Sequence, residues 1–306
     1  MSAMNAEIFY WVLNAGIHGA LVCLLVWVLR LIKPLPRRVV FLLWLGPLVR
    51  LTMPFGVSLP WSVMSLLKRL GSKTVIVSGI RFEEFKVLTL NSVGAAERYF
   101  PIVYKTDRLA KLFEFCTWIW ILGAAICAMS MIALYVLSLR QLRDATQLRG
   151  RICVSETVVT PGLFGILRPK ILVPPGMEGR LLELVEAHEE AHRKRLDNLW
   201  RLLALGVCCL HWFNPLVWYS LKFFFADMEL ACDESVLRKI DQKTRKDYAI
   251  ALLSAAEGRD LFAAAFGGAK LRSRVERVLS YKRLTLGAGI MFSLLAAAVI
   301  SSLVFW

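Results

Sequence analysis

The sequence contains no C-x-x-C pair and only four histidines among its 306 residues. Without paired cysteines it lacks the ligand spacing of zinc fingers. It also lacks an Arg-rich recognition pattern and an RNP-like motif, so we expect no direct binding of nucleic acid. Most of the seven cysteines lie in apolar stretches, which is typical of buried, reduced thiols.

Acidic residues are the other scarce class. The chain has 38 Lys and Arg but only 23 Asp and Glu, which gives a formal net charge of +15. A basic surplus in a chain with long apolar stretches favours contact with anionic lipid head groups. We therefore expect anionic membrane lipids as partners.

Long stretches with few or no charges account for a hydrophobic content of 57%. A helix needs about 20 apolar residues to cross the hydrocarbon core of a bilayer. Stretches that reach or approach this length lie at residues 8–32, 39–55, 112–139 and 284–306. The sequence thus predicts a predominantly α-helical, polytopic membrane protein with about four transmembrane helices.

A fifth apolar stretch, residues 199–225, is interrupted by Arg201, His211 and Pro215. These interruptions favour a broken or interfacial helix over a continuous span, and whether it spans or is re-entrant stays open. His18 and Arg50 would lie inside predicted spans, where ionisable residues are costly. They either have a function or simply face other helices, and the sequence favours the second interpretation.

Basic residues close to the spans predict the orientation of the chain. Lys33, Arg37 and Arg38 follow the first span, whereas no basic residue precedes it. We therefore expect both termini outside, an extracellular loop at 56–111 and a cytoplasmic domain at 140–283. The first span lacks a basic n-region, which indicates a retained anchor rather than a removed signal peptide.

This topology divides the chain into a membrane domain at 1–139, a cytoplasmic domain and a last span at 284–306. Short β-branched runs separated by Gly and Pro occur early in the cytoplasmic domain, at 151–156, 158–165 and 170–175. They predict a small β-hairpin or sheet. Its edge could hold an extended substrate by strand addition, or the sheet could be purely structural.

The most informative motif is His188-Glu189-Glu190-Ala191-His192. On a helix, His188 and His192 would lie on one face about 5–6 Å apart, so that their imidazoles can share a metal ion. Glu189 is rotated by roughly 100° and can face the open position of the metal. This is the H-E-x-x-H arrangement, in which two imidazoles bind zinc and the carboxylate accepts a proton from water. The alternative is a charged amphipathic helix that happens to carry two histidines.

A catalytic zinc usually has three protein ligands and one open position. Glu229 is the best candidate for the third ligand, and Asp233 follows it on the same helical face. Asp233 could accept the spare ring N–H of a zinc-bound histidine. Cys232 and His211 remain alternative ligands, and an ordinary acidic helix face remains the alternative to any site.

Three motifs in this order resemble the BlaR/MecR family of integral-membrane metalloproteases. They are the H-E-E-A-H helix, the run H-W-F-N-P-L-V-W from His211, and the run E-L-A-C-D-E-S-V from Glu229. The T-P-G-L-F-G run at 160–165 looks like the hairpin of that family. The F-G-G run at 266–268 and the basic stretch that follows it resemble the segment before its last span.

The resemblance implies a gluzincin-like peptidase domain on the cytoplasmic face. It implies Zn²⁺ as cofactor, with His188, His192 and Glu229 as ligands. Glu189 would be the general base and Asp233 the supporting carboxylate. It also implies a protein substrate, either a cytoplasmic transcriptional repressor or the chain itself, for which the basic segment 270–283 is a candidate cleavage site or only a surface that contacts head groups.

Sensor members of the family continue into an extracellular penicillin-binding domain with a Ser-x-x-Lys nucleophile. No such domain follows in this sequence, so we do not expect a β-lactam receptor. A signal would then enter through the outer loop, the spans, a separate sensor protein or a second copy of the chain.

The sequence therefore predicts a zinc metalloendopeptidase of a bacterial plasma membrane that acts in signal transduction as an antirepressor. One alternative is a membrane quality-control or CaaX-type metallopeptidase, which shares H-E-x-x-H followed by E-x-x-x-D. Another is a non-catalytic membrane signalling or scaffold protein with a structural zinc site. The intact Glu189 argues against this last alternative, because a structural site needs no such carboxylate.

Overall fold

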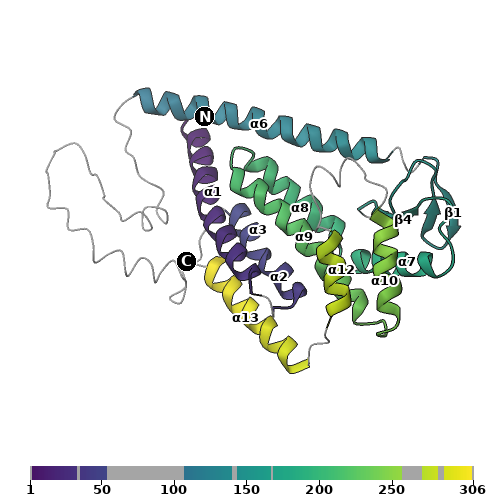
Figure 1. Cartoon of the computed structure of the whole chain (residues 1–306). Helices are drawn as coiled ribbons and strands as arrows, with labels where there is room; N and C mark the ends of the chain where they lie inside the picture. Colours follow the sequence, from purple (N-terminus) through teal and green to yellow (C-terminus); the bar gives the residue numbers. More distant parts are fainter. Residues whose placement is uncertain are drawn as a thin grey trace.

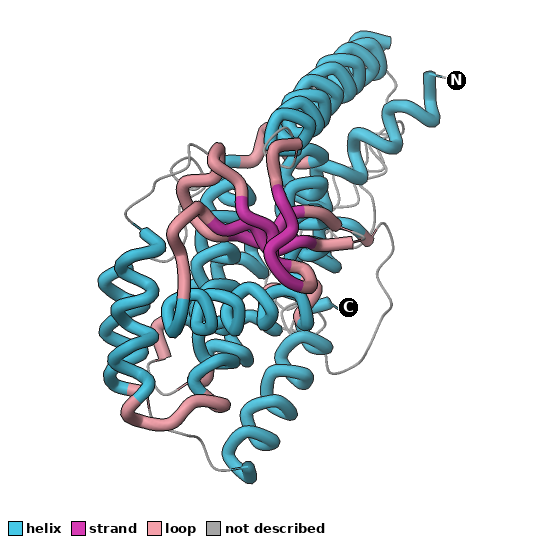
Figure 2. The backbone as a smooth tube through the Cα atoms, turned by 90° about the vertical axis from the view of Figure 1, so that its right-hand side faces the viewer, coloured by secondary structure: helices cyan, strands magenta, loops and turns pink. Residues whose placement is uncertain are grey.

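The computed structural model of the chain is mostly helical and carries one small mixed sheet at an end of the helical body (Figures 1 and 2). The structure describes residues 2–32, 35–53, 107–139, 143–166, 168–256, 271–281 and 286–304. Most of the predicted outer loop, 56–111, lies outside these ranges, as does the F-G-G run at 266–268. The helices are α1 (Ser2–Arg30), α2 (Arg37–Leu43), α3 (Leu45–Thr52), α6 (Asp107–Leu139), α7 (Gly179–Lys194), α8 (Asp197–Leu210), α9 (Pro215–Leu237), α10 (Thr244–Ala256), α12 (Leu271–Ser280) and α13 (Leu286–Val304).

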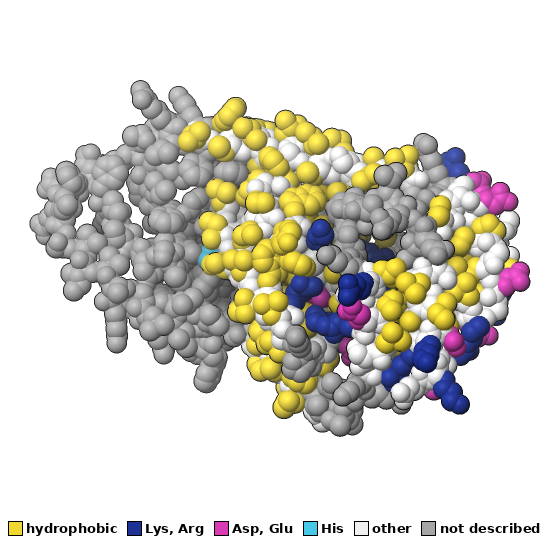
Figure 3. Space-filling view, viewed as in Figure 1, with side chains coloured by type: hydrophobic (Ala, Val, Ile, Leu, Met, Phe, Trp, Pro, Cys, Tyr) yellow, Lys and Arg dark blue, Asp and Glu magenta, His cyan; other side chains and the backbone are white. Residues whose placement is uncertain are grey.

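Within the part of the chain that the structure describes, two helices are long and apolar enough to cross a membrane. They are the segments Trp11–Arg30 of α1 and Glu114–Leu139 of α6, at two of the predicted spans. The most apolar part of the α6 segment contributes no buried residue, and on the face seen in Figure 3 hydrophobic side chains cover α6 and the neighbouring α1. A bilayer would solvate such a surface. In α13, the apolar stretch Ile290–Val299 is shorter, so the fourth span stays a prediction.

The span expected at 39–55 is instead two short helices, α2 and α3, which meet at Trp44. Pro47 has no backbone N–H and cannot bond to the carbonyl of Leu43, four residues earlier. The Trp44 N–H instead bonds to the Phe41 carbonyl, three residues back, at 3.2 Å. The interruption therefore follows from one proline.

The stretch at 199–225 is broken, as expected. Helix α8 ends at Leu210, and α9 begins at Pro215 after a short turn. The side chain of Asn214 accepts a hydrogen bond from the Leu216 N–H at 3.0 Å, which caps α9, and Pro215 occupies its first position. Asn214 and Pro215 therefore account for the start of α9 at this point.

Four short strands form the sheet in the order β1-β2-β4-β3: β1 (Thr146–Arg149), β2 (Ile152–Val154), β3 (Gly162–Phe164) and β4 (Lys170–Val173). The β1–β2 and β3–β4 pairs are antiparallel, and β2–β4 is parallel. This confirms a small sheet, although β1 was not expected and only part of 158–165 is a strand. Its inner face, including Ile152 and Ile171, packs on Leu182 and Val185 of α7. The sheet therefore supports the helix that carries the H-E-x-x-H motif.

Helix α9 is shared by two hydrophobic cores. Its first half, including Phe224, packs with α1, α2, α3 and α8. Its second half, including Val236, packs with α7, α10 and α12. His18 and Arg50 are 2% and 5% exposed, which agrees with side chains that face other helices. All seven cysteines are free, as expected for reduced thiols.

A buried carboxylate joins α9 to the first two helices. Asp227, fully buried, accepts hydrogen bonds from Arg30 Nη2 at 3.0 Å and from Trp44 Nε1 at 2.9 Å. Two turns later, Glu234 accepts the backbone N–H of Arg37 at 2.8 Å. The C-terminal half of α9 is therefore fixed to the end of α1 and the start of α2.

Gly123 determines how closely α6 approaches the turn between α8 and α9. A Cβ at this position would lie 2.3 Å from an indole carbon of Trp212, whose Nε1 donates to the Trp120 carbonyl.

We expect Gly123→Ala to cost about 1–3 kcal/mol of stability through overpacking. Thermal unfolding of the detergent-solubilised chain measures this. Gly206→Ala is the control: it lies in α8 with open space around it, so the better helix former should raise stability or leave it unchanged. Equal midpoints for both variants would contradict the packing argument.

Candidate metal centre

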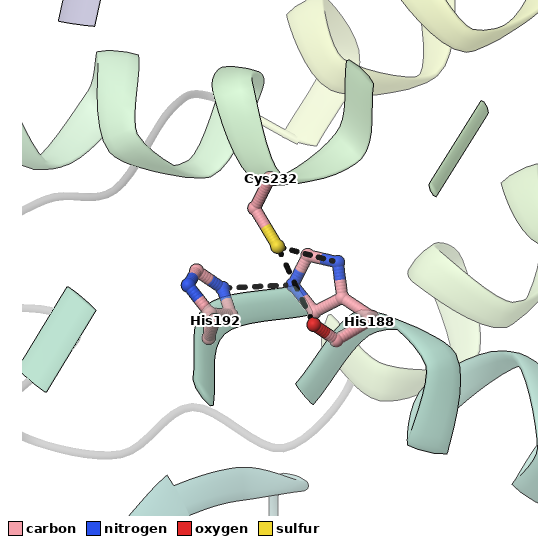
Figure 4. A group of neighbouring side chains, drawn as sticks. All are labelled: His188, His192 and Cys232. Atoms are coloured by element: carbon pink, nitrogen blue, oxygen red, sulfur yellow. Dashed lines mark hydrogen bonds between the residues drawn. The ribbon is translucent and has the colours of Figure 1, made fainter. Parts of the chain in front are cut away.

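Helices α7 and α9 bring the predicted metal ligands and Asp233 together, and Glu189 lies next to His188 on α7. His188, Glu189 and His192 lie on α7, and Glu229, Cys232 and Asp233 lie on the facing part of α9. Figure 4 shows the two imidazoles and the Cys232 thiol pointing toward one another. The i, i+4 spacing on each helix places these side chains on the faces that meet.

Three ligand atoms converge on one point. His188 Nε2 lies 3.1 Å from His192 Nε2, and Glu229 Oε2 lies 3.6 Å from each of these nitrogens. With zinc–ligand bonds of about 2.0–2.1 Å, the ligand atoms of a tetrahedral site lie roughly 3.3 Å apart. The two nitrogens and one carboxylate oxygen therefore fit a single zinc ion in distance and in donor type.

Both imidazoles are oriented through their other nitrogen. His192 Nδ1 lies 2.6 Å from Asp197 Oδ2, and His188 Nδ1 lies 2.8 Å from the Tyr248 hydroxyl. The Tyr248 hydroxyl donates to Asp233 Oδ1 at 2.8 Å, so it accepts from the His188 ring. Each Nδ1 then carries a proton, so each Nε2 can offer its lone pair to a metal once it has lost its own proton.

Asp233 thus supports His188 mainly through Tyr248, with its own Oδ1 3.4 Å from Nδ1. Sequence reasoning missed Asp197 and Tyr248. Asp197 comes close to His192 because Leu196 has a left-handed backbone, with φ of 57°, and turns the chain between α7 and α8. Leucine rarely adopts this conformation, so no sequence signal indicated the turn.

Cys232 is the alternative third ligand. Its sulfur and the two histidine ring nitrogens form a group with donor atoms within 4.8 Å of one another. The thiol, however, donates to the His188 carbonyl and lies 3.7 Å from His188 Nδ1, the nitrogen that already contacts Tyr248. Glu229 faces both Nε2 atoms instead and is the better ligand. His211 is not part of this group, because its Nε2 pairs with the Leu51 carbonyl in another part of the protein.

Two arginines that the motifs did not indicate hold the carboxylates. Arg201 of α8 donates to Glu229 Oε1 at 3.0 Å and leaves Oε2 toward the histidines. Arg274 of α12 donates to both oxygens of Asp233, through Nε and Nη2, at 2.8 Å each. Both arginines lie far from Glu229 or Asp233 in the sequence, which is why spacing alone did not find them.

Burial and charge act in opposite directions on Glu229. Burial disfavours its ionised form, but the neighbouring His192, His188 and Arg274 outweigh this effect and hold the pKa of the carboxyl well below its usual range. For Asp233 the charge and hydrogen bonds of Arg274 likewise overcome burial and lower the pKa. Both carboxylates are therefore ionised at neutral pH, the form that a cation requires.

Glu189 differs from the other acids of the centre. Its side chain is mostly buried, at 7% exposure, yet it makes no hydrogen bond or ion pair with any other described residue. It follows His188 directly on α7 and is therefore rotated away from the shared face of the two histidines. Among the described residues the carboxylate has no hydrogen-bond or ion-pair partner, which leaves it available for proton transfer.

The hairpin edge is less open than the sequence indicated. Ile171 of β4 points its N–H toward β2, where it bonds to the Arg151 carbonyl. Its partner on β3, Leu163, therefore points its own N–H and carbonyl away from β4, toward the outer edge of β3. The Asn198 amide donates to the carbonyls of Leu163 and Gly165 at 3.0 and 2.8 Å. An extended substrate would have to displace Asn198, which disfavours strand addition at this position.

Comparison with known proteins agrees with this geometry. Residues 10–278 match the family model described as BlaR1 peptidase M56. The regulatory protein BlaR1 of Bacillus licheniformis is 34% identical over 102 residues, which cover 32% of this chain and 17% of the relative. The methicillin resistance mecR1 protein of Staphylococcus aureus strain Mu50 is 26% identical over 106 residues, 33% of this chain and 18% of the relative.

These alignments span less than a fifth of the length of either relative, and the activity of either whole relative is not transferred to this chain. The family model, in contrast, covers most of the chain and includes both helices of the metal centre. The chain belongs to the BlaR1 peptidase M56 family.

Proposed function

We propose that the chain is a membrane-embedded zinc metalloendopeptidase of the BlaR/MecR type that cleaves a protein in signal transduction. The observation that supports this most is the convergence of two imidazole Nε2 atoms and one carboxylate oxygen beside an uncommitted glutamate. Membership of a peptidase family makes hydrolysis the natural use of such a centre.

In this proposal His188, His192 and Glu229 hold the zinc ion, which when bound polarises the scissile carbonyl and lowers the pKa of water to about 7. Asp197 orients the His192 ring, as Tyr248 orients that of His188. Arg201 fixes one oxygen of Glu229, so that the other is presented to the metal.

Glu189 is the general base. It takes a proton from the attacking water while the water oxygen bonds to the carbonyl carbon of the peptide. Glu189 then returns the proton to the amide nitrogen as the C–N bond breaks. The second proton of the water also ends on the leaving nitrogen, so the products are a new carboxylate and a protonated amine, and Glu189 ends the cycle ionised.

The basic residues near the spans favour a peptidase domain in the cytoplasm and both termini outside a bacterial plasma membrane. We propose a cytoplasmic protein as substrate, such as a transcriptional repressor, or the chain itself. The names of the relatives, a regulatory protein and a methicillin resistance protein, agree with a regulatory role. Anionic lipids would contact the basic surface, and a sensor protein or a second copy would supply the signal.

Metal content tests the ligand set. Purified full-length protein is expected to hold about one zinc per chain, and Glu229→Ala to lose most of it, because two imidazoles alone bind zinc weakly. Glu183→Ala is the matched control: this glutamate is exposed on α7 and, among the described residues, pairs with Arg180 alone. Elemental analysis after dialysis gives the measurement. Full metal content in Glu229→Ala would show that Cys232 or another group is the third ligand.

A further inference from the structure

Helix α12, which follows the three motifs in the sequence, places the positively charged side chain of Arg274 in the metal centre. Helix α12 packs against α9 and α10, beside which it lies in Figure 1. Its Arg274 side chain is only 15% exposed. Besides Asp233, its guanidinium contacts the centre itself: Nη1 lies 3.4 Å from Glu229 Oε2, and Nη2 lies 3.4 Å from His188 Nε2. These are two of the three atoms that converge on the metal position.

Asp233 fixes the orientation of this guanidinium. A guanidinium has five N–H groups in a rigid fork. Asp233 accepts one from Nε and one from Nη2, in a two-bonded arrangement that holds the plane of the fork. Three N–H groups remain, on Nη1 and Nη2, and they border the atoms that face the metal position.

The other polar groups around the centre make their contacts away from the Nε2 atoms that face the metal position. The Tyr248 hydroxyl donates to Asp233 and accepts from His188. Arg201 donates to Glu229 and to Asn198. His211 lies in a different part of the fold. Among the residues that the structure describes, Arg274 is the cation whose guanidinium contacts two of the atoms that face the metal position.

From this geometry we propose that Arg274 is a catalytic residue that donates a hydrogen bond to the oxyanion forming on the scissile carbonyl. Asp233 is then its positioning residue, in addition to supporting His188. The inference rests on the proposed peptidase function and assigns its oxyanion donor. A fixed donor aimed at developing charge is worth about 10²–10³-fold in kcat.

A purely structural role is the competing explanation, in which Arg274 serves only to pair with Asp233 and hold α12. The experiment compares Arg274→Gln with Arg277→Gln in the full-length, detergent-solubilised protein. Arg277 lies about one turn away on the same helix, and its charge acts on Asp227 and Glu234 and not on the acids of the metal centre. Metal content by elemental analysis comes first, and both variants are expected to keep it.

The second readout needs no known substrate. Inorganic phosphate, a tetrahedral oxyanion, is titrated into the cobalt-loaded protein, and its binding is followed by the visible absorption of cobalt. We expect the phosphate Kd to rise about 10-fold or more for Arg274→Gln and to stay unchanged for Arg277→Gln. Each protein should hold about one cobalt per chain. Unchanged phosphate affinity in a metal-replete Arg274→Gln protein would overturn the proposal.

The third readout is cleavage of a peptide that the wild-type protein cuts. We expect kcat of Arg274→Gln to fall about 10²–10³-fold with little change in KM, since the contact forms in the transition state. If Arg274→Gln does not fold, Arg274→Lys replaces it, because it keeps a charge for Asp233 but loses the fork. Wild-type kcat and phosphate affinity in that variant would also overturn the proposal. A wild-type protein that binds metal and phosphate but cleaves nothing would instead refute the peptidase function.

Discussion

Glu189→Gln is expected to retain its metal and to lose about 10²–10⁴-fold in the rate of proteolysis. The substitution keeps the size of the side chain but removes the base. Because Glu189 makes no hydrogen bond or ion pair with another described residue, the fold loses no identified contact. A selective loss of catalysis would therefore report on proton transfer alone.

The measurement compares new protein N-termini in cells that produce the wild type or Glu189→Gln, by enrichment of N-terminal peptides and mass spectrometry. Glu190→Gln is the matched control, since this neighbouring glutamate forms a surface ion pair with Arg193. It should cleave as the wild type does. A cut in one cytoplasmic protein, absent only in Glu189→Gln, would agree with a dedicated signalling peptidase.

Other outcomes favour the alternatives. Cuts in many misfolded membrane proteins would favour a quality-control peptidase. An identical set of N-termini from the wild type and Glu189→Gln, with full metal content in both, would favour a non-catalytic signalling protein. The comparison thus separates the three functions that the sequence leaves open.

The core of the site was predictable because it depends on local helical periodicity. His188 and His192 are four residues apart, and Glu229 and Asp233 repeat that spacing on α9. Each pair must share a helical face whatever the tertiary fold. Helical spacing does not show that the two faces pack against each other. The resemblance to the BlaR/MecR family indicated this packing, and the structure shows it.

The residues that orient the site were not predictable in this way. Arg274 reaches Asp233 from 41 residues away in the sequence, and Tyr248 reaches His188 from 60. Such contacts depend on how α10 and α12 pack on α9, and no spacing rule encodes them. Asp197 is near His192 in sequence, but its position depends on the left-handed turn at Leu196. Long-range packing and one unusual backbone angle therefore account for what the sequence left out.

Helix α9 connects this site to the predicted membrane part. Glu229 and Asp233 face the metal centre, whereas Asp227 and Glu234 bind the end of α1 and the start of α2. A displacement of α1 against α2 would act on the same helix that carries Glu229, the proposed third ligand. Asp227 is the fully buried acid in this connection.

Asp227→Ala is accordingly expected to lower the free energy of unfolding by about 3–5 kcal/mol. Asp227 is fully buried, and its removal leaves the charge of Arg30 and the indole N–H of Trp44 without their acceptor. Uncompensated groups of this kind cost far more than a surface ion pair contributes. Thermal unfolding in detergent measures the loss.

Asp247→Ala is the control, because this aspartate is exposed on α10, and its change should stay within about 0.5 kcal/mol. Metal content of both variants is measured below their unfolding temperatures. If Asp227 also holds α9 in register, Asp227→Ala should bind zinc more weakly while folded, although it is not a ligand. A stable Asp227→Ala protein with wild-type zinc affinity would show that the fold does not need the α1–α9 connection, and that any signal reaches the metal centre by another route.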